Sequence, residues 1–123
     1  MIKIDNLTKK YNDQFAVKSL SLDIDEGNVL GFLGPNGAGK TTTMKMITGF
    51  ISPDTGDVKV DGLSVKDNSY AVRESIGYLP EGAPHYGEMI TKDFLKFIIN
   101  IRDIKNKDSL DFVIESLSLK NIL

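Results

Sequence analysis

The sequence lacks several features that would place it in other classes of protein. It contains no cysteine, so disulfides and thiolate metal sites are excluded. Its most apolar stretch, residues 94–101, is interrupted by Lys96 and Asn100 and is too short to cross a bilayer. The formal net charge of −2 offers no electrostatic case for nucleic acid as a ligand. Residues 1–5 show no signal peptide, and we expect a cytoplasmic protein that reaches a membrane only through a partner.

Histidine is almost absent as well. The single histidine, His85, lies in a turn-rich stretch, and we expect it in a surface loop. The length of 123 residues leaves room for one small domain or for part of a larger one. An apolar share of 41% and a charged share of 26% are those of an ordinary soluble globular protein.

The sequence does contain a glycine-rich pattern that binds phosphate. Residues 34–41 match G-x-x-x-x-G-K-[ST] at every required position. The glycines permit backbone angles that a Cβ would forbid, and they let the chain approach phosphate closely. Lys40 can reach phosphate oxygens, Thr41 offers a hard hydroxyl oxygen to Mg²⁺, and Thr42 can donate a further hydrogen bond to phosphate. The expected binding residues here are Gly34, Pro35, Asn36, Gly37, Ala38, Gly39, Lys40, Thr41 and Thr42.

The segments on either side of this loop agree with a phosphate site. Residues 28–33 predict a short buried strand, and residues 42–48 predict a helix that Gly49 ends. A strand, a glycine loop and a helix in this order direct backbone N–H groups toward an anion. The helix N-terminus adds the positive end of its dipole.

The remaining patterns predict further strands and helices. Residues 2–7 indicate an edge strand that reaches toward Tyr11, and residues 19–24 alternate as a half-buried strand does. Residues 58–65 predict a hairpin that turns at Asp61 and Gly62. The other expected elements are a short helix over residues 69–74, a buried strand over residues 76–79, and helices that begin near Thr91 and Asp108.

Together these motifs resemble one family, the ATP-binding domains of ABC transporters. Residues 34–42, Gly-Pro-Asn-Gly-Ala-Gly-Lys-Thr-Thr, look like that family's own version of the loop. Residues 7–22 are similar to the segment that supplies its adenine-stacking aromatic residue, and residues 52–62 match its small antiparallel sheet. Residues 76–81 match the strand that leads into its helical subdomain, so the resemblance covers essentially the whole chain.

The resemblance implies an α/β fold, the P-loop NTPase core of an ABC-type ATPase. Residues 1–81 would form the nucleotide-binding core with its antiparallel β subdomain, and residues 82–123 would begin the helical subdomain. Tyr11 would stack on adenine, because an aromatic face can lie on a purine without a base-specific hydrogen bond. Val17 would add an apolar contact to the nucleotide. The alternative for Tyr11 is that it only closes a strand.

Glu81 is a departure from the family pattern. The family usually has glutamine here, which bonds to Mg²⁺ or to the attacking water. Glu81 can still offer an oxygen to the metal, with an added negative charge, and the alternative is a solvated loop carboxylate. The resemblance therefore implies Lys40 and Glu81 as catalytic residues, with Thr41 and Glu81 as ligands of Mg²⁺.

Two parts of a complete ATPase of this family are missing from the sequence. No run of four apolar residues is followed by Asp-Glu, and the Leu-Ser-Gly-Gly-Gln signature is absent. We therefore expect a truncated, N-terminal part of the domain that binds ATP and Mg²⁺ and does not hydrolyse ATP alone. No Asn-Lys-x-Asp motif is present, which disfavours a GTPase or a small-molecule kinase.

The resemblance also implies partners. In the complete domain, ATP hydrolysis would drive transport through a transmembrane permease subunit on the inner face of the cell membrane. ATP would bind between two such subunits in a head-to-tail dimer. Two alternatives remain open: a soluble ABC-type ATPase without a membrane partner, and a nucleotide-binding module that does not hydrolyse ATP.

Overall fold

The computed structural model describes residues 1–82, 86–106 and 108–121. These residues form two compact units, Met1–Tyr78 and Leu79–Leu123. The expectation for His85 lies outside the described residues.

The first unit is built around a four-stranded antiparallel sheet in the order β2-β1-β3-β4. The strands are β1 (Ile2–Tyr11), β2 (Gln14–Ile24), β3 (Thr55–Val60) and β4 (Leu63–Ser64). Asn12 and Asp13 have positive φ angles of 45° and 63°, as a two-residue turn between twisted strands requires. Asp61 and Gly62 make the same kind of turn, with φ angles of 48° and 82°, so the predicted hairpin is confirmed.

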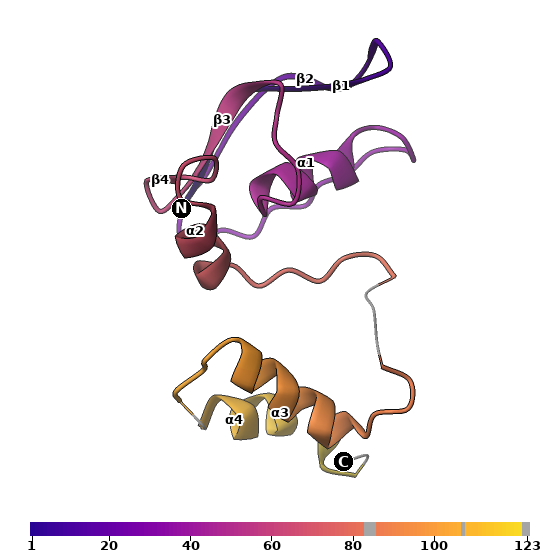
Figure 1. Ribbon diagram of the computed structural model, residues 1–123, viewed down its shortest axis with the longest axis vertical. Helices are drawn as coiled ribbons and strands as arrows, with labels where there is room; N and C mark the ends of the chain where they lie inside the picture. The colour runs from indigo at the N-terminus through magenta and orange to yellow at the C-terminus, as the bar shows by residue number, and fades with distance from the viewer. Residues whose placement is uncertain (83–85, 107, 122–123) are drawn as a thin grey trace. The chain divides into compact units, whose positions relative to one another are not determined.

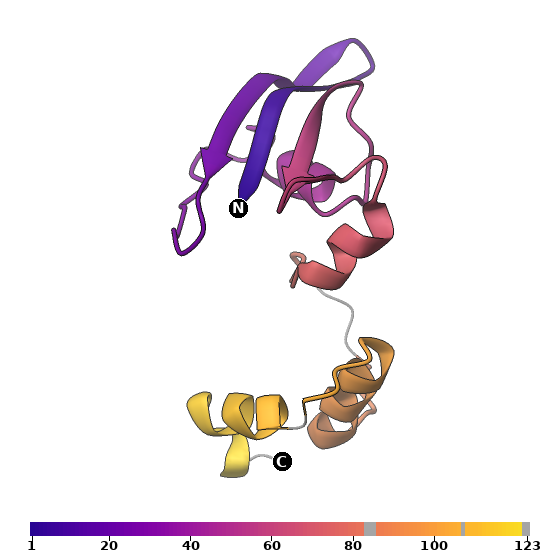
Figure 2. The same cartoon turned by 90° about the vertical axis from the view of Figure 1, so that its left-hand side faces the viewer.

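β1 is an interior strand, and the expectation of an edge strand was wrong. It pairs with β2 on one side and with β3 on the other, which Figure 2 shows. β3 returns to β1 only after the loop and α1 (Lys40–Ile47) have been traversed. A local alternation pattern cannot indicate such a distant pairing, because it reports only which face of a strand is apolar.

α1 packs against one face of this sheet and closes the core (Figure 1). Ile4 and Leu7 of β1 are both buried although they are three residues apart, because a bulge with Asn6 at φ 46° lies between them. α2 (Ser69–Ser75) matches the predicted short helix and contributes one buried residue, Val72. The buried apolar residues of the core are Ile4, Leu7, Val17, Met46, Ile47, Val58, Val60, Val65 and Val72.

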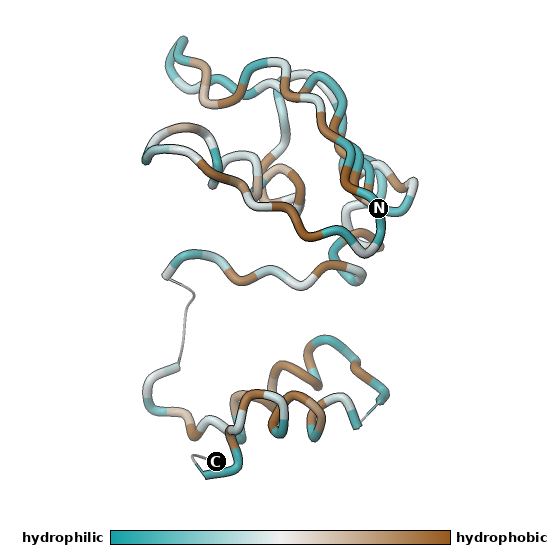
Figure 3. The backbone as a smooth tube through the Cα atoms, turned by 180° about the vertical axis from the view of Figure 1, so that it is seen from behind, coloured by the Kyte–Doolittle hydropathy of each residue, from teal (hydrophilic) through white to brown (hydrophobic). Residues whose placement is uncertain are grey.

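Two predicted strands are not formed. Residues 28–33 and 76–79 carry no regular secondary structure. Val29 is 100% exposed and Leu33 is 94% exposed, and Figure 3 shows the apolar colouring of this run between β2 and α1. A strand of a buried parallel sheet needs hydrogen-bonded neighbours. Residues 28–33 pair with no strand in the part of the chain that the structure describes.

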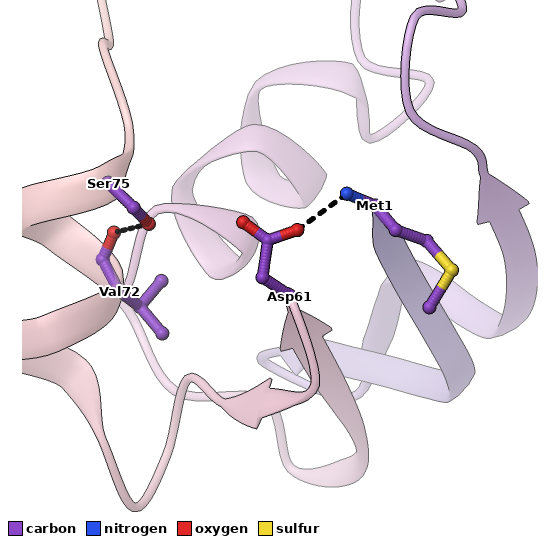
Figure 4. A network of polar contacts seen from close by, with 4 residues as sticks. All are labelled: Met1, Asp61, Val72 and Ser75. Carbon is purple, nitrogen blue, oxygen red and sulfur yellow. Dashed lines mark hydrogen bonds and ion pairs between the residues drawn. The ribbon is translucent and has the colours of Figure 1, made fainter.

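The first residue of the chain is tied to the β3–β4 turn. The terminal ammonium of Met1 donates to Asp61 Oδ1 at 2.7 Å (Figure 4). The Asp61 N–H in turn donates to the Met1 carbonyl at 2.9 Å. The hydrogen bond to Asp61 raises the pKa of this ammonium. Nearby, the Ser75 hydroxyl donates to the Val72 carbonyl at 2.8 Å and closes the end of α2.

The second unit is helical. It contains α3 (Thr91–Ile101), α4 (Asp108–Ser116) and a short 3₁₀ turn, η1 (Leu119–Asn121). α3 begins at Thr91, as predicted, and its cap residue, Ile90, makes no side-chain capping hydrogen bond. The rings of Tyr86 and Phe97 meet edge to face at 5.9 Å. Among the described residues, no helix has both the length and the apolar character needed to span a membrane.

Candidate functional site

The predicted phosphate loop lies between β2 and the start of α1, and its lysine folds back over it. Lys40 Nζ donates to the Pro35 carbonyl at 2.8 Å and also to the Gly34 carbonyl. The Ala38 N–H donates to the same Pro35 carbonyl at 3.2 Å. One ammonium is therefore held at the beginning of a helix by the backbone of its own loop.

The amide groups at the start of α1 suit an anion. The cap residue of α1 is Gly39, with φ 90°, and no side chain accepts a hydrogen bond from the first turn. The first amides of a helix have no partner within the helix, and they lie at the positive end of its dipole. Phosphate oxygens are the acceptors that such a helix end binds best.

The three threonines of α1 differ in what they present to solvent. Thr43 is buried, and its hydroxyl donates to the Gly39 carbonyl at 2.9 Å, which closes the first helical turn. Thr42 is half-buried, and Thr41 is exposed. Thr41 is therefore open to solvent, and the binding of Mg²⁺ by its hydroxyl stays a prediction.

The loop also touches the hairpin of β1 and β2 at one point. A Cβ placed on Gly39 would lie 2.2 Å from the carbonyl oxygen of Ala16 and 3.2 Å from Cγ2 of Val17. Gly39 is required here because no larger residue fits against the backbone of β2. Val17 thus lies beside the loop, but it is only 8% exposed, and its contact with a nucleotide stays a prediction.

Tyr11 ends β1 and is 50% exposed. Lys9 Nζ lies 5.7 Å from the centroid of its ring, within the range of a cation–π contact. Its role on adenine stays a prediction. Glu81 is exposed and belongs to the second unit, whereas the loop belongs to the first. Its predicted part in binding Mg²⁺ therefore also stays a prediction.

Sequence reasoning missed the role of Asp54. The resemblance assigned residues 52–62 only to a small antiparallel sheet, whereas the Asp54 carboxylate reaches back to the end of β1. Its Oδ2 accepts the Lys10 N–H at 2.7 Å, and its Oδ1 pairs with Lys9 Nζ at 3.0 Å. The available signal was the residue type, because aspartate in a turn commonly binds nearby backbone N–H groups.

The glycine loop leads into a helix that no side chain of its cap residue caps, and Lys40 folds back over the loop. These features define a phosphate-binding site of the P-loop class. Comparison with known proteins narrows this class. The sequence model of the ABC transporter family matches residues 17–123. The bacitracin transport ATP-binding protein BcrA of Bacillus licheniformis is 34% identical over 121 residues, which cover 98% of this chain and 40% of that protein.

Solved structures agree with this assignment. An ATP-binding subunit of an ABC transporter superposes with a TM-score of 0.76 at 25% identity, covering 87% of this chain and 44% of the other. A dimeric ATP-binding cassette, solved in a post-hydrolysis state with ADP and phosphate, superposes with a TM-score of 0.53 at 30% identity, covering 61% of this chain and 34% of the other. The chain therefore belongs to the ABC transporter family of ATP-binding proteins. It spans about two fifths of the length of BcrA.

Proposed function

We propose that this chain binds MgATP through residues 34–42, and that the complete protein hydrolyses ATP to energise transport across a membrane. The observation that carries the proposal is the position of Lys40, whose ammonium lies on the loop at the start of an uncapped helix. A cation and free helix amides at one place attract a polyphosphate. Membership of the family and a relative named for bacitracin transport support the wider function.

In this proposal the loop and Lys40 hold the β- and γ-phosphates, and Thr41 contributes its hydroxyl to Mg²⁺. Among the described residues, no group of three or more acidic or histidine side chains could hold a metal ion by itself. This fits Mg²⁺, which proteins usually bind through one or two side chains together with the phosphates of the substrate. When bound, Mg²⁺ neutralises the charge of the phosphate oxygens. The family resemblance also suggests Glu81 as an oxygen ligand of Mg²⁺.

The base would stack on Tyr11 at the end of the β1–β2 hairpin. The exposure of the ring and its place on a strand whose partner contacts Gly39 support this assignment. Val17, which lies beside Gly39, would add an apolar contact to the nucleotide. The nucleotide would therefore extend from the start of α1 toward the end of β1.

Partners and location follow from the same family membership. A second ATP-binding subunit would complete the site in a head-to-tail dimer, and a permease subunit would hold the protein at the inner face of the cell membrane. The dimeric cassette with ADP and phosphate bound supports the first of these partners. The transporter name of the curated relative supports the second.

The direct test is a calorimetric titration of MgATP into the purified chain and its Lys40→Ala variant. The charged contact of Lys40 with phosphate is worth about 1.5–3 kcal/mol, so we expect the Kd to rise roughly 10- to 150-fold. The matched control is Lys45→Ala, which removes an exposed lysine from the same helix and should leave the Kd within about twofold. Equal affinity of the wild type and Lys40→Ala, or no binding by the wild type, would contradict the proposal.

A further inference from the structure

The end of β1 extends beyond its neighbour β3. The pairing of β1 with β3 stops at Thr8 and Thr55, whereas β1 continues to Tyr11. The last three residues of β1 therefore have a strand, β2, on one side only. An isolated two-stranded hairpin is marginally stable in water, so the position of Tyr11 depends on whatever holds the open side.

Asp54 holds that open side. Its N–H donates to the Thr8 carbonyl at 2.9 Å, which continues the ladder by one bond. Its Oδ2 then accepts the Lys10 N–H at 2.7 Å. The carboxylate thus occupies the place that the next residue of a longer β3 would have taken, and it fixes the backbone immediately before Tyr11.

The second oxygen of the same carboxylate acts on the ring of Tyr11 indirectly, through the Lys9 ammonium. Asp54 Oδ1 pairs with Lys9 Nζ at 3.0 Å, and the Lys9 side chain is only 18% exposed. The Lys9 ammonium lies 5.7 Å from the centroid of the Tyr11 ring. The Lys10 N–H and the Lys9 ammonium lower the pKa of Asp54, so both contacts favour its charged form.

We propose that Asp54 is the positioning residue of the base-binding end of the site. It fixes the backbone before Tyr11 and places the Lys9 ammonium against one face of the ring, so that the other face is presented to the base. The inference rests on the proposed function, in which Tyr11 stacks on the base of ATP. Its physical basis is preorganisation, because a ring that is already ordered loses less entropy when the nucleotide binds.

Asp54 should affect binding of the base and leave binding of the phosphates unchanged, so a ligand without a base tests its role. We would titrate MgATP and magnesium tripolyphosphate, which has no base, into the wild-type chain and its variants. Asp54→Ala should weaken MgATP binding about 3- to 10-fold, a part of the roughly 5- to 150-fold loss typical of removing one base–aromatic stack in Tyr11→Ala. Both variants should bind tripolyphosphate within about twofold of the wild type. Lys40→Ala should weaken both ligands.

A double variant tests whether Asp54 acts through Tyr11. If it does, adding Asp54→Ala to Tyr11→Ala should cause no further loss of MgATP affinity, whereas independent effects would add. Asp54→Asn keeps an acceptor for the Lys10 N–H, so it preserves the turn if the alanine variant does not fold. It should still weaken MgATP binding about twofold or more, because the charge beside Lys9 is lost.

The outcomes are distinguishable from failure of the proposed function. Equal losses for MgATP and tripolyphosphate in Asp54→Ala, or additive losses in the double variant, would overturn the positioning role while Lys40→Ala still behaved as expected. An Asp54→Asn variant with wild-type affinity for MgATP would overturn it as well. A wild-type chain that bound neither ligand would instead overturn the proposed function itself.

Discussion

The close approach of Gly39 to β2 gives a sharp test of how the loop is built. Gly39 and Gly37 lie in the same loop and have nearly equal backbone angles, with φ 90° and φ 85°. A Cβ on Gly39 would lie 2.2 Å from the Ala16 carbonyl oxygen, whereas a Cβ on Gly37 would have no atom within 4 Å. Gly39→Ala and Gly37→Ala therefore form a matched pair that shares the backbone strain and differs in the collision.

The expected losses of stability follow from the backbone strain and from the collision with the Ala16 carbonyl. A left-handed backbone costs a residue with a Cβ about 1–2 kcal/mol, and both variants incur this cost. Overpacking adds about 1–3 kcal/mol for Gly39→Ala alone, because the colliding atom belongs to a paired strand and cannot rotate away. We expect losses of about 1–2 kcal/mol for Gly37→Ala and about 2–5 kcal/mol for Gly39→Ala, from a total stability that is typically about 5–15 kcal/mol.

The assay is urea unfolding of the wild-type chain and both variants, followed by circular dichroism and analysed at a common slope. The difference between the two variants isolates the collision with Ala16, because the backbone term cancels. Equal destabilisation by the two substitutions would refute the packing of the loop against β2. A Gly37→Ala variant less stable than Gly39→Ala would refute it even more directly.

Two further predictions concern the N-terminus and catalysis. Because the pKa of the Met1 ammonium is raised above its ordinary value of 8.0, its pairing with Asp61 stabilises the fold fully below that pH and is lost as the pH rises through the raised pKa. Asparagine tolerates the φ of 48° at this position, so Asp61→Asn removes the charge and keeps the turn. The unfolding free energy of this variant should be lower than that of the wild type at pH 7 and should equal it at alkaline pH. A difference in unfolding free energy that did not change with pH would contradict this prediction. The 123-residue chain should release phosphate from MgATP no faster than a buffer control in a colorimetric assay, because its sequence contains no run of four apolar residues followed by Asp-Glu. Repeated turnover that Lys40→Ala abolishes would show that expectation to be wrong.

Much of the first unit could be predicted from local patterns. The glycines and the lysine of residues 34–40 specified the loop, because Gly37 and Gly39 adopt left-handed angles that favour glycine. The hairpin at Asp61 and Gly62 and the short helix α2 were also indicated by neighbouring residues alone. These features depend on turn chemistry and helical period, which a sequence displays within a few residues. The family, and with it the α/β fold class, followed from the same motifs.

Other features were decided only by the tertiary structure. The interior place of β1 depends on β3, which returns to it after the loop and α1, and the collision that makes Gly39 necessary comes from Ala16 on another strand. The link from Asp54 to Lys9 and Lys10 spans more than forty residues, so no local pattern could display it. The same reason explains the wrong prediction for residues 28–33: their composition is that of a buried strand, but a strand forms only where a partner supplies its hydrogen bonds.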